Sequence, residues 1–443
     1  MFSQNTEQTM ALLAQAALAP LLLHLLVYLL SGSFVTRLAK QYRSSIEKLL
    51  FSDKALEPFP TPIPQDKPKP RILLTGATGY VGGSVLHALL SHPSLTTTIT
   101  PSNPITLPLR GAPDRLAKLT ATYGPRVHPV PITSLDDIPT ITRLASAHDV
   151  VVNAGSGFHP PSAEALVRGL ALRKARTKTP VWMLHTSGCS NIADKPVTGT
   201  PRPDVEYEDA NAEAVFAFEE EENKRDWYPQ RAAELAVLRT AEELGVQAAS
   251  IQAPCIFGTG TGLFQTAGLM IPIMMGFVLG RGYGFTVGDG SGVMDRVHVA
   301  DLADLYVLCV LDVLQRDGAN VPTGRAGIVF PTAGRTLTAD IARKCLDVAF
   351  ATRNLPKPGG PRGKEVRTLT IEEAAVTTAG NASVAETGWG GHRKTKGTVA
   401  RERLGWRPTR LDEAWERDFE TELRAALSGR RGATIAACIA DTK

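Results

Sequence analysis

The feature that most constrains this chain is a glycine-rich turn between an apolar strand and an amphipathic helix. Residues 71–75 read RILLT, residues 76–83 read GATGYVGG, and apolar residues then recur at helical spacing. Gly76 permits a tight bend, Gly79 lets a pyrophosphate approach the backbone, and Gly82 lets the helix pack on the strand. The N–H groups at the helix start then face the phosphates. We therefore predict a dinucleotide-binding Rossmann domain that begins near Arg71, with cofactor contacts from Gly76, Thr78, Gly79, Tyr80, Val81 and Gly82.

The end of the second strand indicates which dinucleotide binds. This strand, Ile105 to Leu109, is followed by Arg110, and the first acidic residue is Asp114. A carboxylate at the strand end would accept hydrogen bonds from the adenosine ribose and select NAD. A guanidinium there instead favours a 2′-phosphate. We predict NADP, with Arg110 as its selecting residue and NAD as second choice; a solvated surface arginine is the alternative.

Two further parallel strands are predicted at residues 127–132 and 149–153. The second runs into a turn of small residues, and ligands of open α/β sheets bind at such carboxyl ends. An ordinary turn is the alternative interpretation. We assign three more cofactor contacts to this turn, at Asn153, Ala154 and Gly155.

A long apolar segment precedes the domain. Residues 10–30 are mostly apolar, and the basic residues come after them, at positions 37, 40, 43 and 48. The length matches the hydrocarbon core of a bilayer, and the basic flank places the following domain in the cytosol. We predict a single-pass N-terminal transmembrane helix, in the endoplasmic reticulum, and a semi-rigid proline-rich spacer at 57–70. An interfacial helix and a cleaved signal peptide are the alternatives.

Six motifs occur in one order along the chain: TGATGYVGG, VVVNAG, LHTSG, QAPCIFGTGTG, RVHVADLADLYV and RERLGWRP. Together they resemble the extended short-chain dehydrogenase/reductases, the NAD(P)-dependent epimerase/dehydratase-like branch, over residues 71–427. The resemblance implies an α/β fold: a doubly wound parallel Rossmann sheet with a smaller, discontinuous C-terminal substrate lobe. The implied boundaries are 1–34 for the anchor, 35–70 for the linker, 71–256 for the Rossmann domain, 257–430 for the lobe with returning sheet elements, and 431–443 for the tail.

The resemblance also implies a catalytic trio of a hydroxyl residue, a tyrosine and a lysine four residues later. Ser187 matches the hydroxyl position, although a backbone-capping role at the strand end is an alternative. No ungapped register supplies both Tyr and Lys from residues 226–234, which read DWYPQRAAE. Pro229 is suited to open a helix, which would place Tyr228 and Arg231 on adjacent turns. We predict Tyr228 and Arg231 as a modified catalytic pair, with Arg231 and Pro254 also near the nicotinamide; Tyr228 as a mere helix-start residue is the alternative.

Several other segments bear on function. The apolar stretch 263–284 either lines a lipophilic substrate pocket or packs the lobe core. His298 and Asp301 match the family's structural signature at the lobe junction. The net charge of +4 is spread along the chain, so we expect no nucleic-acid partner. The five cysteines show no metal-binding spacing and are expected to be reduced thiols, with no metal site.

These features predict a membrane-anchored NAD(P)-dependent oxidoreductase that acts on a lipophilic carbonyl or alcohol. Two alternatives stay open: a cofactor-binding sensor or scaffold without turnover, and an epimerase or dehydratase that uses the cofactor transiently. A homodimer is the candidate assembly. The imperfect Tyr/Lys pair is the feature that supports the non-catalytic alternative.

Overall fold

The computed structural model describes residues 69–111, 113–430, 432 and 434. The predicted membrane anchor and nearly all of the proline-rich spacer lie outside these residues. Within the described part of the chain, no helix is both long and apolar enough to cross a bilayer. The residues from Pro64 onward form one structural unit.

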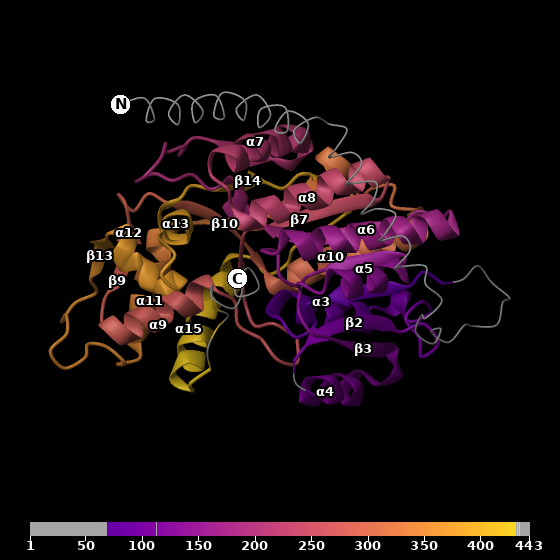
Figure 1. The fold of residues 1–443 in the computed structure, drawn as a ribbon. Coiled ribbons are helices and arrows are strands. Elements are labelled where there is room, and N and C mark those ends of the chain that lie inside the picture. The colour runs from indigo at the N-terminus through magenta and orange to yellow at the C-terminus, as the bar shows by residue number, and fades with distance from the viewer. Residues whose placement is uncertain (1–68, 112, 431, 433, 435–443) are drawn as a thin grey trace, which may run out of the picture. The chain divides into compact units, whose positions relative to one another are not determined.

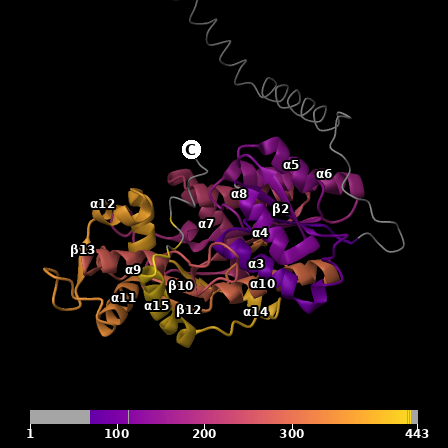
Figure 2. The same ribbon diagram turned by 90° about the horizontal axis from the view of Figure 1, so that it is seen from below.

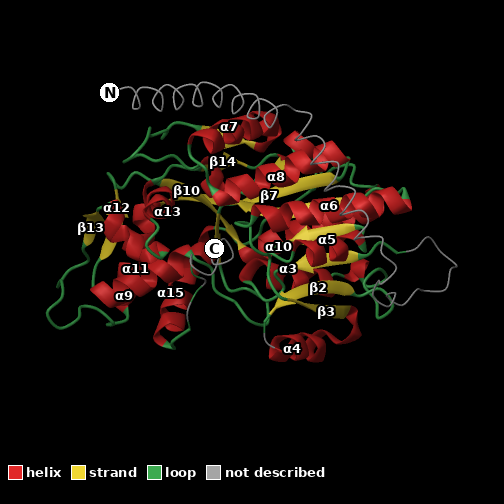
Figure 3. Cartoon of the chain, in the orientation of Figure 1, coloured by secondary structure: helices red, strands yellow, loops and turns green. Residues whose placement is uncertain are grey.

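A seven-stranded parallel sheet organises the N-terminal part of this unit (Figure 1, Figure 3). Its strand order is β11-β7-β5-β4-β1-β2-β3, the order of a doubly wound Rossmann sheet. The strands are β1 (Ile72–Thr75), β2 (Ile105–Arg110), β3 (Val127–Ile132), β4 (Val150–Asn153), β5 (Trp182–Gly188), β7 (Gln247–Ala253) and β11 (Ile328–Val329). The strands predicted from the sequence are confirmed. Because the order reverses between β1 and β4, a ligand crevice opens at their carboxyl ends.

Helices cover both faces of this sheet (Figure 1, Figure 2). One face carries α3 (Tyr80–Ser91), α4 (Pro113–Tyr123) and α10 (Val299–Arg316), and the other carries α5 (Ile138–Ser146), α6 (Pro160–Thr177), α7 (Ala212–Arg225) and α8 (Pro229–Leu244). Alternate residues of β1 pack against the helices on opposite faces of the sheet. Leu74 packs in the α3/α10 layer and Leu73 in the α6/α8 layer, both fully buried. Burying each such side chain stabilises the fold by about 1.5–3 kcal/mol. Because the strands are buried on both faces, their sequences are continuous apolar runs.

The C-terminal lobe combines short strands and helices around its own aromatic core. Its sheets are β8 (Cys255–Phe257) with β10 (Val293–His298) and β12 (Gly334–Leu337), and β9 (Gly284–Val287) with β13 (Val366–Leu369). Its helices are α9 (Met270–Arg281), α11 (Thr338–Ala351), α12 (Ile371–Ala374), α13 (Ala382–Ala385) and α15 (Asp412–Leu427). Between these elements the chain returns to the Rossmann sheet through α10 and β11. The lobe is therefore discontinuous in sequence.

Three elements connect the two parts. Strand β6 (Glu206–Glu208) pairs in parallel with β14 (Lys394–Lys396), and α14 (Val399–Glu402) follows. This pairing joins the segment before α7 to the end of the lobe. Residues near position 200 are thereby held beside residues near position 390.

The apolar stretch 263–284 packs the lobe rather than lining a lipophilic pocket. Most of it forms α9, and Met274 and Met275 are fully buried in the lobe core with Phe285. Phe277 is partly buried and packs edge-on against Phe285, with ring centroids 4.6 Å apart. Of the two interpretations left open by the sequence, the structure supports core packing.

Candidate functional site: a dinucleotide cradle and a tyrosine cleft

The glycine turn has the geometry that its sequence predicted. Gly76 adopts φ of +76°, and a methyl group there would lie 2.2 Å from the carbonyl oxygen of Ala154. A methyl group on Gly82 would lie 2.3 Å from the Gly76 oxygen. The Gly79 N–H donates to that same oxygen at 2.8 Å, which closes the turn. The turn therefore requires glycine at both ends.

Helix α3 starts directly after this turn. Within the described residues its N-terminus has no side-chain cap and no acid in its first turn, so its free N–H groups and positive dipole end suit a phosphate. The hydroxyl group of Tyr80 donates to the Gly258 oxygen at 2.6 Å, and burial raises the pKa of Tyr80 well above its usual value. Tyr80 thus ties the helix start to the loop after β8, while Val81 is half-buried. Only the backbone of Tyr80 is available to the phosphates.

A pocket of about 280 Å³ extends from the turn to the end of β2. Its polar lining comprises Thr75, Thr78, Arg110, Arg115, Asn153, Ser156 and Ser162. Arg110 ends β2 as expected, and burial lowers its pKa without discharging a guanidinium. Arg115, in the first turn of α4, is a second cation that the sequence interpretation missed. Among the described residues no carboxylate lines this pocket, so its charge suits a phosphate on the adenosine ribose.

The end of β4 is fixed by a hydrogen-bond network. The Thr75 hydroxyl group donates to Asn153 Oδ1 at 2.6 Å, and the Gly155 N–H donates to Thr75 Oγ1 at 3.1 Å. Asn153 Nδ2 lies 2.9 Å from His185 Nδ1, and burial lowers the pKa of His185 to about 4. Asn153, Ala154 and Gly155 therefore hold the crevice between β1 and β4 open. Pro254, buried between β7 and β8, follows the carboxyl end of β7, which pairs with β5 rather than with β4.

Tyr228 stands at the start of α8, and Pro229 is the first helical residue, as predicted. The Tyr228 hydroxyl group donates to Ser190 Oγ at 3.2 Å, and the Ser190 hydroxyl group donates to Gln230 Oε1 at 2.5 Å. The Gln230 amide is held against the ends of β4 and β5, because a methyl group on Gly188 would lie 2.9 Å from its Nε2 atom. Phe158 packs edge-on against the Tyr228 ring, with centroids 6.0 Å apart. A tyrosine, a serine and an amide therefore meet at the carboxyl ends of the central strands.

Ser187 is not the hydroxyl residue beside Tyr228. Its side chain is 3% exposed and accepts from Asn191 Nδ2 at 3.0 Å, in a buried polar cluster with Glu234. Ser190 occupies the place beside Tyr228 that the sequence interpretation gave to Ser187. It lies in the 3₁₀ turn that follows β5, and only this turn redirects a hydroxyl group toward α8. The available signal was a second serine just after the strand end.

Arg231 lies near the Tyr228 ring, with its guanidinium carbon 5.9 Å from the centroid, but it serves the backbone. The side chain is 4% exposed, and it donates to the carbonyl oxygens of Asn191 at 2.8 Å and Asp226 at 2.5 Å. Burial lowers its pKa. The predicted i, i+3 proximity is therefore present, while the guanidinium holds two loops in place. Gln230, which the sequence interpretation missed, is the α8 side chain bonded to Ser190.

Two buried carboxyl groups lie below this cleft. Glu219 Oε1 accepts from Gln252 Nε2 at 2.6 Å, and the same nitrogen lies 3.1 Å from both oxygens of Glu234. Burial raises the pKa of Glu234 to about 6 and raises that of Glu219 as well. Desolvation and mutual repulsion thus favour the protonated form of a carboxyl group in this pair.

The residues of the lobe junction are structural, as expected. His298 caps α10 by accepting from the Ala300 N–H at 3.1 Å. Asp301 is buried and accepts from the Arg410 N–H at 2.9 Å and from its guanidinium at 2.6 Å. His392 Nδ1 lies 2.9 Å from Asp194 Oδ2, which links the lobe to the loop after β5. These contacts fix the lobe against the sheet.

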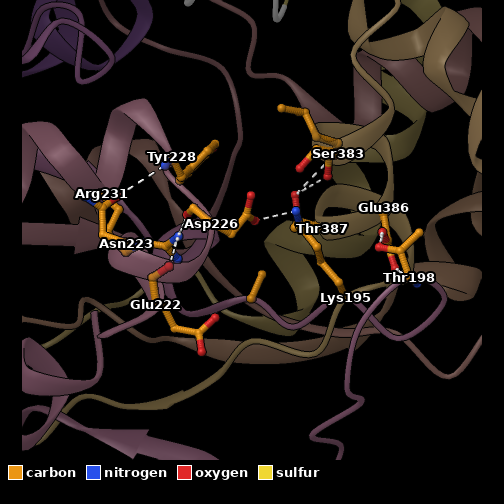
Figure 4. Close-up of polar contacts among 12 residues, drawn as sticks. Lys195, Thr198, Glu222, Asn223, Asp226, Tyr228, Arg231, Ser383, Glu386 and Thr387 are labelled. Carbon is orange, nitrogen blue, oxygen red and sulfur yellow. Dashed lines mark hydrogen bonds and ion pairs between the residues drawn. The ribbon is translucent and has the colours of Figure 1, made fainter. Parts of the chain in front are cut away.

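A second pocket, of about 310 Å³, lies beside Tyr228 (Figure 4). Its Rossmann-side lining is Ser190, Ala193, Asp194, Lys195, Thr198, Gly199, Thr200, Arg202, Glu222, Arg225, Asp226, Tyr228 and Arg231, and the lobe contributes Ser383 and Thr387. Charged and hydroxyl side chains dominate this wall. The pocket therefore suits a polar ligand within reach of the Tyr228 and Ser190 hydroxyl groups.

The chain matches the family described as the NAD dependent epimerase/dehydratase family over residues 72–320, more than half of its length. It belongs to this family. The matched residues contain the glycine turn, the ends of β4 and β5, and the Tyr228 cleft. The resemblance drawn from the six motifs is confirmed, and a nicotinamide dinucleotide is the family's cofactor.

Two curated relatives cover most of the chain. The oxidase ucsJ of Acremonium sp. is 27% identical over 346 residues, which span 76% of this chain and 92% of the relative. The UDP-glucose 4-epimerase of Azospirillum brasilense is 25% identical over 320 residues, spanning 67% of this chain and 84% of the relative. Family relatives therefore include an oxidase and an epimerase.

Among solved structures, the dTDP-glucose 4,6-dehydratase DesIV of Streptomyces venezuelae, with NAD and TYD bound, is similar. It shares 16% identity and a TM-score of 0.53, and the match covers 81% of this chain and 98% of DesIV. This likeness shows the common fold.

Proposed function

We propose that this family member is an NADP-dependent oxidoreductase that interconverts a carbonyl and an alcohol, with Tyr228 as its proton carrier. The observation that carries the proposal is the hydrogen bond from the Tyr228 hydroxyl group to Ser190, at the carboxyl ends of β4 and β5. The polar pocket opens at this pair of hydroxyl groups. An acid and a hydrogen-bond partner for a substrate oxygen thus lie together.

The described residues fit a nicotinamide dinucleotide. The turn at Gly76, Gly79 and Gly82 would hold the pyrophosphate, and Arg110 with Arg115 would hold the adenosine end. Asn153 and Gly155 line the same pocket at the end of β4. When bound, the nicotinamide supplies or accepts the hydride, and this chemistry belongs to the cofactor.

The side chains of this chain manage the proton. In the reductive direction Tyr228 donates its proton to the substrate oxygen, and Ser190 holds that oxygen by a hydrogen bond. The Ser190 hydroxyl group has one proton, which it donates to Gln230 in the structure, so this hydroxyl group turns from Gln230 to the substrate oxygen when substrate binds. The role first assigned to Ser187 thus passes to Ser190 in this proposal. Arg231, predicted as the cationic partner of Tyr228, bonds to backbone carbonyl oxygens instead.

The pocket also changes the expected substrate. The sequence suggested a lipophilic compound, but charged and hydroxyl groups line the cavity beside Tyr228. Burying uncompensated polar groups against an apolar ligand would cost about 1–3 kcal/mol for each group. A polar carbonyl or alcohol therefore fits the wall better. Tethering to a membrane through residues 10–30 is a separate part of the proposal.

The test is NADPH oxidation with a panel of polar aldehydes and ketones. Tyr228→Phe should lower kcat by about 10²–10⁴ with little change in NADPH affinity, as loss of an acid catalyst does. Ser190→Ala should lower kcat by about tenfold, the effect of one hydrogen bond. Tyr283→Phe is the matched control, since its ring packs against Phe277 in the lobe. Unchanged turnover in Tyr228→Phe would contradict the assignment.

One observation favours the non-catalytic alternative. The α8 side chain bonded to Ser190 is the neutral amide of Gln230, which supplies no positive charge to assist a phenolate. A chain that binds NADPH tightly but oxidises it with no carbonyl in the panel would be a sensor or scaffold. Product formed without net NADPH consumption would instead identify an epimerase or dehydratase.

A further inference from the structure

The pocket beside Tyr228 has an excess of positive charge. Four cationic side chains line it, Lys195, Arg202, Arg225 and Arg231, against the three acids Asp194, Glu222 and Asp226. Asp194 contacts the His392 ring and accepts from the backbone N–H groups of His392 and Arg202. Among the residues that line the pocket, the cations therefore outnumber the acids by one, and the buried Glu386 carboxylate lies behind this lining, bonded to Thr198.

Most of these cations are committed to the protein. Arg231 bonds to backbone carbonyl oxygens. Arg202 lies over the Phe218 ring at 4.9 Å and lies 3.8 Å from Glu222, which also pairs with Arg225. The Arg225 side chain is 70% exposed, so it points largely to solvent. The fourth cation of the pocket lining is Lys195.

Lys195 pairs with Asp226, and this pair is readily exchanged. The Lys195 side chain is 25% exposed, whereas the Asp226 side chain is 52% exposed. Asp226 also sits just after the C-terminus of α7, where the helix dipole disfavours a negative charge. Ion pairs of this exposure contribute about 0–1 kcal/mol. A ligand anion in the pocket would therefore displace Asp226 at little cost.

The position of Lys195 relates this charge to the reaction. Figure 4 shows the pair between the start of α8, which carries Tyr228, and the lobe segment with Ser383 and Thr387. The cavity of about 310 Å³ is at the small end for ligand pockets. A compact molecule would thus reach Tyr228 with one end and Lys195 with the other.

We infer that the substrate carries a carboxylate, which binds Lys195 in place of Asp226 while its carbonyl or alcohol group meets Tyr228 and Ser190. This inference rests on the proposed function. One surplus charge matches a monoanion, and Lys195 recognises it as a point charge. The hydroxyl groups of Ser383 and Thr387 line the same side of the cavity.

The test measures anion binding separately from turnover. Glutarate, its monomethyl ester and inorganic phosphate are titrated calorimetrically into the full-length protein, with and without NADPH. Glutarate and its monomethyl ester both keep a free carboxylate, so both should bind, and Lys195→Met should weaken their binding by about tenfold, as loss of a charge-assisted hydrogen bond does. Lys195→Arg should restore most of the affinity. Lys224→Met is the matched control, because Lys224 pairs with Glu221 on the exposed side of α7.

Asp226→Asn tests whether Asp226 competes with the bound carboxylate for Lys195. It removes the internal competitor, so glutarate should bind about two- to fivefold more tightly. Weaker glutarate binding in Asp226→Asn would overturn the inference, because removing a competing carboxylate cannot weaken the binding of an anion at Lys195. Tighter binding of phosphate than of glutarate would replace the carboxylate by a phosphate. Absence of glutarate binding, or affinity unchanged in Lys195→Met, would also overturn it.

Turnover then separates the two proposals. If glutarate binds at Lys195 but no oxo acid or hydroxy acid is converted, the oxidoreductase proposal fails while the anion site stands. If carbonyl compounds are reduced but acids and their methyl esters react equally, the anion site fails while the oxidoreductase stands.

Discussion

NADPH should bind more tightly than NADH, and Arg110 should account for most of the difference. The adenosine pocket contains two guanidinium groups and, among the described residues, no carboxylate. A hydrogen bond between a charged donor and a phosphate contributes about 1.5–3 kcal/mol. Because 1.4 kcal/mol is a factor of ten, Arg110→Ala should weaken NADPH binding about 10- to 150-fold. NADH, which lacks the 2′-phosphate, should be almost unaffected.

The assay is a calorimetric titration of both dinucleotides into the wild type, Arg110→Ala, Arg115→Ala and the double variant. Arg110 and Arg115 are both exposed, so solvent screens each of them, and the double variant should lose more NADPH affinity than either single variant. Arg417→Ala is the control, because that side chain is 70% exposed on α15. The NADPH preference should also fall with added salt. Equal affinities for the two dinucleotides in the wild type would refute the reasoning.

Three further outcomes are expected. Gly76→Ala should destabilise the fold and abolish NADPH binding. Gly111→Ala, also at positive φ but with open space around it, should lower the free energy of unfolding by only about 1 kcal/mol. Urea unfolding compares the two variants. Because Glu234 has a folded pKa raised from 4.5 to about 6, the folded state holds more protons between these values. Stability should therefore fall as the pH rises, by roughly 1 kcal/mol from pH 4.5 to 6 and by roughly 2 kcal/mol over the whole titration, relative to Glu234→Gln, measured by unfolding at each pH. Deleting residues 1–56 should convert a membrane-pelleting protein into a soluble one that still binds NADPH; a full-length chain that stays in the supernatant without detergent would contradict the anchor.

The cofactor cradle could be predicted because its determinants are local in sequence. The turn from Gly76 to Gly82 needs its glycines for the distances to the Ala154 and Gly76 oxygens, and a strand and a helix flank it directly. Arg110 could be placed because β2 ends there. Arg115 was missed because its contribution depends on how α4 folds back over the end of β2.

The tyrosine cleft could be predicted only in part. Pro229 gave the start of α8, and this placed Tyr228 correctly at the helix entrance. The directions of the side chains could not be predicted from the sequence in the same way. Ser187 lies on β5, and its hydroxyl group bonds within the buried cluster, while the turn after the strand brings Ser190 to Tyr228. The roles of Gln230 and Arg231 likewise depend on which face of α8 meets the sheet.

The arrangement of the second pocket suggests how specificity is separated from cofactor binding. The segment between β5 and α8, residues 189–228, supplies the charges at Lys195 and Asp226 as well as the Tyr228 hydroxyl group. It contacts the lobe through β6 and β14 and contributes no residue to the adenosine pocket. Changes in this one segment would therefore alter which substrate is recognised, and how its oxygen is protonated, without disturbing the glycine turn or Arg110. The chemistry of the substrate is set by residues that only the folded chain brings together, whereas the dinucleotide is recognised by residues whose roles follow from their order in the sequence.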